Sequence, residues 1–312
     1  MARSPVTSTS PAAERLGGRS VILQVVHSLR PSQWTKNVFV FAGLIFGLQL
    51  GNPTAVWRAC AAFGVFCLLS GVVYLVNDIL DREADRLHPV KARRPIASGA
   101  LSPAHGAGAA AILSIVAVSA AFALGSPFGM VATTYLLLLG LYSAWLKHIV
   151  IVDVLTIAAG FVLRAIGGVV VVGVEFSHWL LLLMLLGALF LALSKRRAEL
   201  VTLADDAHGH RRILAEYSPY LLDQMISVVT ASTLLAYAFY TIDPGTVEKF
   251  GTDRLLWTVP FPLYGIFRYL YLVHQREGGG NPSEVLLTDR PILACVALWG
   301  AAVILILYGH RP

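Results

Sequence analysis

The sequence has little charge for its length. Asp, Glu, Lys and Arg make up 13% of its 312 residues, whereas hydrophobic residues make up 56%. A soluble globule of this size needs more polar surface than these residues can supply. The shortage of charge therefore excludes a soluble protein and predicts a chain that lies in a lipid bilayer.

Cysteine is also scarce. Cys60, Cys67 and Cys295 lie inside apolar runs, and their spacing is not that of metal ligands. These residues support neither a disulfide framework nor a zinc site. The start of the chain lacks the apolar core of a signal peptide, so residues 1–19 are predicted to be a disordered cytoplasmic tail.

The apolar residues gather in nine runs, at approximately 37–51, 55–76, 104–124, 127–146, 149–173, 178–194, 224–242, 255–273 and 291–309. Most runs approach the ~20 residues that a helix needs to cross the hydrocarbon core. Residues 20–30 have apolar side chains at helical spacing, which is typical of a helix in the membrane surface. We therefore expect an all-α, polytopic protein with nine transmembrane helices, in which residues 20–312 form a single membrane domain.

The Lys and Arg residues predict how these helices are oriented. If the N-terminus is inside, 19 of the 24 lie in cytoplasmic segments, four lie outside, and Arg164 lies within a span. This is a strong positive-inside bias for an odd number of helices. The long segments at 77–103, 195–223 and 274–290 then share the cytoplasmic face of the plasma membrane. The formal charge of +6 comes from the same cytoplasmic Lys and Arg residues. It therefore does not indicate a nucleic-acid partner, and we expect none.

A charged segment, residues 77–99, follows directly on the second apolar run. In a continuous helix, Asn77, Asp78, Asp81 and Asp85 lie within an arc of about 100°. Carboxylates that close repel one another unless a cation lies between them, and an all-oxygen set suits Mg²⁺ that is shared with a substrate diphosphate. We predict that these four residues bind Mg²⁺ and that the three aspartates are catalytic. The alternative is a solvated helix face with local ion pairs.

Basic residues follow the acidic ones. His88-Pro89 is expected to end the helix, so that Lys91, Arg93 and Arg94 lie in a loop. Their cationic groups can clamp phosphate oxygens and neutralise a departing diphosphate. We predict that they bind substrate. As an alternative, they serve only as topology anchors.

These residues carry a resemblance to a known family. The pattern N-D-x-x-D-x-x-x-D from Asn77 to Asp85, and the R-P-x-x-S-G segment from Arg94 to Gly99, resemble the UbiA superfamily of intramembrane prenyltransferases. The resemblance implies a bundle of nine helices around a central cavity that is open to lipid. It also implies that the acidic residues hold Mg²⁺ on a diphosphate.

The chain departs from that family after the sixth apolar run, where most members have a second Asp-rich motif. Here Lys195, Arg196 and Arg197 stand with one carboxylate, that of Glu199. A second Mg²⁺ site is therefore not expected, and we predict that the three cations bind phosphate oxygens directly. Alternatively, they only mark the cytoplasmic end of a helix.

Four isolated polar residues are predicted to bind substrate in the same region. Lys36 precedes the first run, Tyr142 and Lys147 flank the turn between the fourth and fifth runs, and Arg164 lies within the fifth. A charge within a span should face a cavity or a partner. We expect a substrate phosphate as the partner of Arg164. The alternative is an internal ion pair, although Asp153 is about three turns away and too distant to form it.

Further segments resemble one branch of the superfamily, which transfers 5-phosphoribose to decaprenyl phosphate: Leu29 to Ala42, Ser194 to Leu200, Arg268 to Tyr271 and Leu286 to Pro291. The resemblance implies Mg²⁺-dependent transfer from 5-phosphoribosyl diphosphate to decaprenyl (polyprenyl) phosphate, with release of diphosphate, for arabinan and cell-wall precursor synthesis. The many cations agree with a donor that carries an additional phosphate. Two alternatives stay open, namely prenyl transfer to an aromatic acceptor and lipid-phosphate transport. A homo-oligomer and the role of residues 201–223 are also left open.

Overall fold

A computed structural model describes residues 21–175, 178–202, 213, 216–275, 285 and 288–309 of the chain. Within these ranges every regular element is a helix, and no strand occurs. The all-α prediction is therefore confirmed. The tail predicted at residues 1–19 and most of the segment 203–215 lie outside the described residues.

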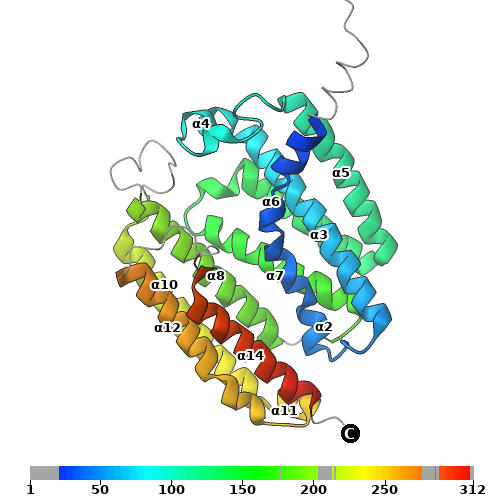
Figure 1. Cartoon of the computed structure of the whole chain (residues 1–312), viewed down its shortest axis with the longest axis vertical. Coiled ribbons are helices and arrows are strands. Elements are labelled where there is room, and N and C mark those ends of the chain that lie inside the picture. The colour runs from blue at the N-terminus through cyan, green and yellow to red at the C-terminus, as the bar shows by residue number, and fades with distance from the viewer. Residues whose placement is uncertain are drawn as a thin grey trace, which may run out of the picture.

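Figure 1 shows the arrangement of the helices. In chain order they are η1 (Pro31–Phe41), α2 (Ala42–Phe46), α3 (Pro53–Leu80), α4 (Arg82–Leu87), η2 (Lys91–Arg93), α5 (Pro103–Leu124), α6 (Ser126–Ala144), η3 (Leu146–His148), α7 (Val152–Val172), α8 (His178–Thr202), α10 (Pro219–Ile242), α11 (Pro244–Phe250), η5 (Arg254–Thr258), α12 (Pro260–Gln275) and α14 (Arg290–Tyr308). The elements labelled η are 3₁₀ helices.

The long helices α3, α5 and α10 begin in the same way, with a polar capping residue followed by proline. The side chains of Asn52, Ser102 and Ser218 accept hydrogen bonds from backbone N–H groups of the first turn. Proline then occupies the first helical position, where its missing N–H is not needed. These short sequence signals fix where three of the long apolar helices start.

Seven of the nine predicted spans are helices long and apolar enough to cross a membrane: α3, α5, α6, α7, α8, α10 and α14. The other two runs form shorter elements in the part of the chain that the structure describes. The first run is divided between η1 and the five-residue α2, and the eighth lies largely in α12, which has 16 residues. A multi-pass membrane protein is therefore confirmed, whereas the count of nine crossings is not.

The helices form two groups. In one group, α3, α5, α6 and α7 enclose a core in which the ring of Phe66 lies 5.9 Å from that of Phe128 and 5.3 Å from that of Tyr135. In the other, α8, α10, α12 and α14 surround Phe190 and Tyr269. The helices α7 and α8 pack against each other and join the two groups (Figure 1).

The first segment packs directly on α7 because one side of the contact has no side chain. A Cβ atom on Gly168 would lie 1.8 Å from the carbonyl oxygen of Val40, so only glycine permits η1 to approach this closely. A Cβ on Gly43 of α2 would likewise lie 2.8 Å from the Cα of Val169. Backbone contact therefore holds η1 and α2 against α7.

The far end of α14 meets α2. The Tyr308 hydroxyl donates a hydrogen bond to the carbonyl oxygen of Ile45 at 3.2 Å. Leu307 is buried in a small apolar cluster against which Phe46 and Leu48 pack. This contact joins the last long helix to the first segment of the chain.

The helix expected at 20–30 is present at 21–28. Leu29 is buried with Val72, whereas Ile22 and Leu23 are exposed, as expected for side chains at a membrane surface. Arg30 follows with a φ of +52°, a left-handed conformation that is uncommon for residues other than glycine. The chain therefore turns sharply at Arg30 before η1 begins.

Ion pairs involve the segments that are expected to share one face. Lys147 contacts Asp81 across the turn between α6 and α7. Arg197 of α8 and His274 of α12 both contact Asp223 of α10. These contacts join segment 77–103 to the turn at Lys147, and segment 195–223 to the end of α12.

Candidate active site

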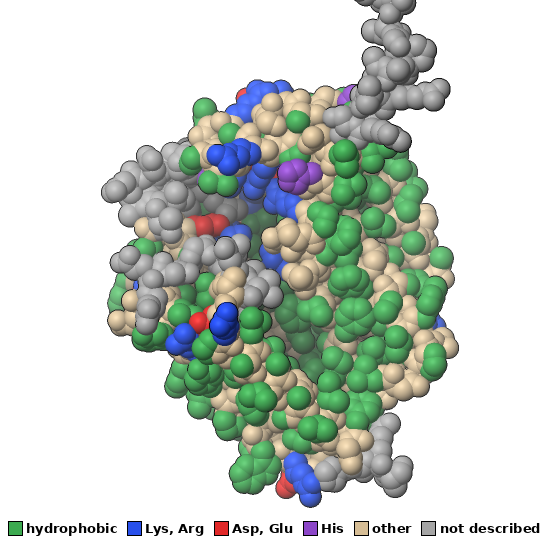
Figure 2. Space-filling model, viewed as in Figure 1, with side chains coloured by type: hydrophobic (Ala, Val, Ile, Leu, Met, Phe, Trp, Pro, Cys, Tyr) green, Lys and Arg blue, Asp and Glu red, His purple; other side chains and the backbone are tan. Residues whose placement is uncertain are grey.

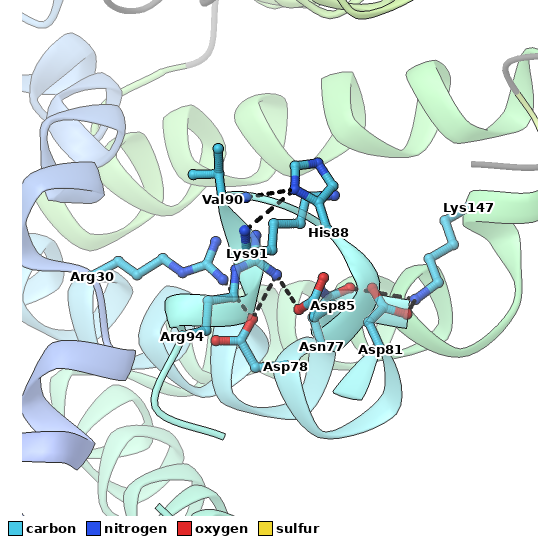
Figure 3. A network of polar contacts seen from close by, with 10 residues as sticks. All are labelled: Arg30, Asn77, Asp78, Asp81, Asp85, His88, Val90, Lys91, Arg94 and Lys147. Carbon is cyan, nitrogen blue, oxygen red and sulfur yellow. Dashed lines mark hydrogen bonds and ion pairs between the residues drawn. The ribbon is translucent and has the colours of Figure 1, made fainter. Parts of the chain in front are cut away.

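The acidic residues lie where α3 gives way to α4 (Figure 3). Asp81 separates the two helices, yet the helical hydrogen bonds continue, from Asp81 N to Asn77 O at 2.9 Å and from Asp85 N to Asp81 O at 2.8 Å. Asp78 and Asp85 are buried. The expected continuous helix is therefore nearly realised, with a small break at Asp81.

Asp78 and Asp85 converge on one arginine. The Nη1 atom of Arg94 lies 2.5 Å from Asp85 Oδ2 and 3.2 Å from Asp78 Oδ1. Arg30 contacts the same oxygen of Asp78, with its Nη2 atom 2.5 Å from Oδ1, and its guanidinium lies 4.6 Å from the ring centroid of Tyr74. Two guanidinium groups thus bind the first aspartate.

Asn77 and Asp81 face a different cation. The buried Lys147 ammonium lies 2.5 Å from Asp81 Oδ1 and 3.5 Å from Asn77 Oδ1. Lys147 is carried by η3, the short 3₁₀ turn between α6 and α7. The lysine therefore ties this turn to the end of α3.

The single group of four oxygen donors expected from the sequence is divided into two pairs. On a helical projection Asp78 and Asp85 are about 20° apart and Asn77 and Asp81 about 40° apart, so each pair forms its own stripe. Arg94 binds one stripe and Lys147 the other. Among the described residues, no group of three or more His, Cys, Asp or Glu side chains is placed to hold a metal ion together.

The donor set still fits a divalent metal in its chemistry. All four side chains offer oxygen, which Mg²⁺ prefers. The buried Asp78 Oδ2 atom has no hydrogen-bond partner in the part of the chain that the structure describes. Each pair of donors also already converges on one cationic nitrogen atom. The residues can therefore hold a metal if Arg94 or Lys147 moves aside.

The basic loop is folded back over these carboxylates. His88 Nδ1 accepts hydrogen bonds from the N–H groups of Val90 and Lys91, at 3.1 and 3.3 Å, and so shapes the turn that leads to Arg94. Arg93 is exposed. Arg94 thus reaches the acidic residues as predicted, whereas Lys91 and Arg93 lie beside them in η2.

Arg196 lies in a second, buried network. Its guanidinium donates to Asp153 at 2.8 Å, to Glu199 at 2.8 Å and to the Tyr142 hydroxyl at 3.3 Å. Tyr217 donates a further hydrogen bond to Asp153 at 2.8 Å. Asp153, Arg196 and Tyr142 come from α7, α8 and α6, so the network joins three helices.

The neighbours of Arg196 point elsewhere. Arg197 forms an ion pair through two nitrogen atoms with Asp223, which also contacts His274. Lys195 lies 3.8 Å from Glu199 and its side chain is 49% exposed, so it remains accessible to a ligand. Lys195 and Arg196 therefore share Glu199, whereas Arg197 pairs with a different carboxylate, that of Asp223.

Arg164 has neutral partners. It donates to Asn37 Oδ1 at 2.7 Å, to the Tyr135 hydroxyl at 2.7 Å and to the Gly160 carbonyl at 3.0 Å, and it lies over the ring of Phe161. The structure thus pairs Arg164 with neither Asp153 nor another carboxylate within the described ranges. Its uncompensated charge lies next to η1.

Lys36 adds to this positive region. Burial, followed by the neighbouring cations Lys195, Arg164 and Arg30, lowers the pKa of the Lys36 ammonium to about 8. Lys36 precedes the first apolar run and lies outside the seven long spans. No carboxylate pairs with it in the described part of the chain. Lys36 and its neighbours are therefore suited to an anion.

The chain matches a known protein family over most of its length. The UbiA prenyltransferase family model matches residues 37–286. The chain belongs to the UbiA prenyltransferase family. The resemblance seen in its acidic and basic motifs is thereby confirmed.

Two relatives of this UbiA protein are named decaprenyl-phosphate phosphoribosyltransferase. The relative from Corynebacterium glutamicum is 34% identical over 293 residues, which cover 91% of this chain and 86% of the relative. The relative from Mycobacterium tuberculosis is 32% identical over 305 residues, which cover 95% and 97%. These matches extend over nearly the whole chain.

The fold also agrees with solved UbiA structures. A UbiA homolog from Archaeoglobus fulgidus bound to GPP and Mg²⁺ matches with a TM-score of 0.71 and 17% sequence identity, over 91% of this chain and 99% of that one. At this level of identity the likeness concerns the fold alone.

Sequence reasoning did not single out Arg30 as a site residue of this UbiA protein. Arg30 stands immediately before Pro31 at the start of the first segment, and only the folded chain brings it to Asp78. The available signal was an arginine directly before Pro31, at the start of the segment that also holds Lys36. The partnership of Asp153 with Arg196 was not anticipated either.

Proposed function

We propose that this UbiA protein transfers 5-phosphoribose from 5-phosphoribosyl diphosphate to a polyprenyl phosphate such as decaprenyl phosphate, with release of diphosphate. The names of its relatives and the extent of their similarity support this assignment. The product would be a lipid-linked precursor for cell-wall arabinan.

The observation that carries the proposal is the surplus of positive charge beyond the acidic residues. Arg30, Arg94 and Lys147 already balance the three aspartates. Lys36, Arg164 and Lys195 lie nearby, and the pKa of Lys36 is lowered first by burial and then by the charges of the other two. A prenyl diphosphate donor carries one anionic group, whereas the proposed pair of substrates carries a diphosphate and two separate phosphates. The group formed by Lys36, Arg164 and Lys195 is therefore suited to bind one of these separate phosphates.

The reaction needs no general base. An oxygen atom of the polyprenyl phosphate is already anionic at neutral pH and forms the new bond to ribose C1. The bond from C1 to the diphosphate oxygen breaks, and its electron pair leaves with the diphosphate. The contribution of the basic residues is to bring two anions together in line and to stabilise the charge on the leaving group.

Asn77, Asp78, Asp81 and Asp85 are the residues that would hold a divalent metal, which we infer to be Mg²⁺. When bound, it would supply fixed positive charge to the leaving diphosphate. Arg94 and Lys147 lie within reach of the same oxygen donors and would bind the phosphate oxygens directly.

The lipid substrate requires an apolar path beside the charged region. Figure 2 shows a hollow whose upper part has Lys and Arg side chains and whose lower part is hydrophobic. We infer that the phosphate binds in the upper part and that the isoprenoid chain follows the lower part into the bilayer. The excess of Lys and Arg at this end supports a site on the cytoplasmic face of the plasma membrane.

The decisive experiment combines the purified protein with Mg²⁺, 5-phosphoribosyl diphosphate and polyprenyl phosphate. Diphosphate release that depends on all three, together with a phosphoribosylated lipid seen by mass spectrometry, is the expected result. Release without lipid would indicate hydrolysis. Transfer of a prenyl group from geranyl diphosphate to an aromatic acceptor, with no phosphoribose transfer, would reject the proposal.

The low pKa of Lys36 predicts how substrate binding depends on pH. Lys36 is protonated below a pH of about 8 and neutral above it, so its attraction for a phosphate is lost as the pH rises through 8. We expect the KM for the phosphorylated substrate it contacts to rise roughly tenfold between pH 7.5 and 9.5. The substrate phosphates keep their charge over this range because their second pKa is near 6.

The matched variant is Lys36→Arg, since arginine stays charged at pH 9.5. Its KM should remain nearly constant across the same range. A KM that rises equally in the wild type and in Lys36→Arg would assign the pH dependence to another group and remove Lys36 from the phosphate site.

A further inference from the structure

The acidic residues carry their own set of cations. Three carboxylates, those of Asp78, Asp81 and Asp85, are paired with three cationic side chains. Arg30 comes from the turn before η1, Arg94 from the loop after η2, and Lys147 from η3. The local charge of these six groups is zero without any bound ion.

Nitrogen atoms of Arg94 and Lys147 occupy the positions between carboxylate oxygens that a metal ion would need. One nitrogen atom of Arg94 is shared between Asp78 and Asp85, and the Lys147 ammonium is shared between Asp81 and Asn77 (Figure 3). The position between Asp78 and Asp85 is poorly accessible to water, because these side chains are 2% and 5% exposed. At the second position the side chain of Lys147 is 6% exposed, whereas that of Asp81 is 32% exposed. Interactions between charges are strong where the side chains are buried.

A free metal ion would therefore meet an obstacle. To bind Asp78 and Asp85 together it must displace Arg94, which would then be left as a desolvated cation beside a divalent one. A metal ion that arrives with a diphosphate avoids this cost, since the displaced guanidinium and ammonium groups can donate to phosphate oxygens. Metal and diphosphate should favour each other's binding.

We propose that Arg30, Arg94 and Lys147 are built-in counter-cations of the acidic motif. In the free protein they occupy its cation positions and keep its affinity for free divalent metal low. When a metal–diphosphate complex binds, Arg94 and Lys147 turn from carboxylate to phosphate oxygens, while Arg30 stays on Asp78. The step from carboxylate to phosphate rests on the proposed function, whereas the low affinity for free metal does not.

Arg30 is suited to stay on Asp78 when Arg94 and Lys147 change partners. Its left-handed backbone conformation is one that a protein keeps when the surroundings hold it firmly. Stacking on Tyr74 and burial of the adjacent Leu29 supply that support. Arg30 can therefore hold Asp78 in place and leave its unpartnered Oδ2 atom free for the metal.

The test is a titration of the full-length protein with Mn²⁺, in which free Mn²⁺ is followed by its electron paramagnetic resonance signal. We expect the wild type to bind Mn²⁺ at least about tenfold more tightly in the presence of inorganic pyrophosphate, after correction for the complex formed in protein-free solution. In Arg94→Gln, Mn²⁺ alone should bind at least about tenfold more tightly than it does to the wild type, a change of ~1.4 kcal/mol. Lys147→Gln should act in the same direction.

Lys249→Gln is the matched control, since it removes an exposed cation in α11, distant from the acidic residues in sequence and in the fold. Its Mn²⁺ affinity should equal that of the wild type. Equal Mn²⁺ affinity of the wild type with and without pyrophosphate would overturn the proposal, even if neither site variant folds. Folded Arg94→Gln and Lys147→Gln proteins with unchanged Mn²⁺ affinity would overturn it as well.

The titration and the transfer assay can fail separately. If Mn²⁺ binding behaves as expected and no phosphoribose is transferred, the proposed function is wrong and the counter-cations remain. If transfer occurs but Mn²⁺ binds tightly to the wild type without pyrophosphate, the counter-cations are rejected and the proposed function stands.

Discussion

Replacement of Asp81 by Asn is expected to lower kcat for phosphoribose transfer by a factor of about 100 to 1,000, the usual effect of removing one main source of charge stabilisation for the transition state. The neutral amide is a far weaker metal ligand than the carboxylate. Its oxygen can still accept the hydrogen bond from Lys147, so the fold around η3 should persist. Initial rates at saturating Mg²⁺, together with size-exclusion profiles, measure both effects.

Glu83→Gln is the appropriate control for Asp81→Asn. Glu83 lies in α4, two residues beyond Asp81, but its side chain is 76% exposed and pairs only locally, with Arg86 and Arg82. Its replacement should leave kcat within about twofold. Wild-type activity in Asp81→Asn would remove the acidic residues from the active site.

Replacement of Arg196 by Met should destabilise the folded protein by ~3–5 kcal/mol. Asp153 is fully buried, and loss of its ion-pair partner leaves a carboxylate whose remaining partner is the Tyr217 hydroxyl. For a chain of this size we expect the midpoint of thermal unfolding in detergent to fall by roughly 10 °C. Size-exclusion chromatography after heating measures the remaining folded protein.

Two further variants test whether the loss of stability in Arg196→Met comes from the buried pair of Asp153 and Arg196. Arg197→Gln removes the adjacent arginine, whose pair with Asp223 is partly exposed, and should cost no more than ~1 kcal/mol. The double replacement of Asp153 by Asn and Arg196 by Met removes both charges and should recover much of the lost stability. Equal destabilisation by Arg196→Met and Arg197→Gln would mean that the buried network is not what holds α6, α7 and α8 together.

The sequence was sufficient for the features that depend on neighbouring residues. Apolar runs of spanning length predicted seven of the long helices, and pairs such as Asn52-Pro53 mark where they begin. The helical spacing of Asn77 to Asp85 was also enough to predict a nearly continuous helix through the four side chains, although not their division into two pairs. Each of these predictions depends on a repeat or a cap within one helix.

The sequence could not predict which charged residues pair across helices. Lys195, Arg196 and Arg197 look equivalent in the sequence, but successive residues on a helix point about 100° apart. One therefore faces Asp153, another Asp223, and the third stays half-exposed. Which carboxylate lies opposite is decided by the packing of α8 between α7 and α10, which no local pattern reports. The first and eighth runs are each divided between a 3₁₀ segment and a shorter α-helix, and composition alone does not distinguish these two kinds of helix.

The contact at Gly168 has a consequence for how a long lipid could enter. Since the backbone of η1 rests on α7 with no side chain between them, that wall of the molecule cannot yield without breaking its closest packing. The contact of α14 with the first segment depends on side chains instead: the Tyr308 hydroxyl donates to the Ile45 carbonyl at 3.2 Å and accepts from the Leu50 N–H at 3.5 Å, and Leu307 packs with Phe46 and Leu48. We therefore expect the hollow to widen for a long lipid at this side-chain contact and not at the backbone contact between η1 and α7.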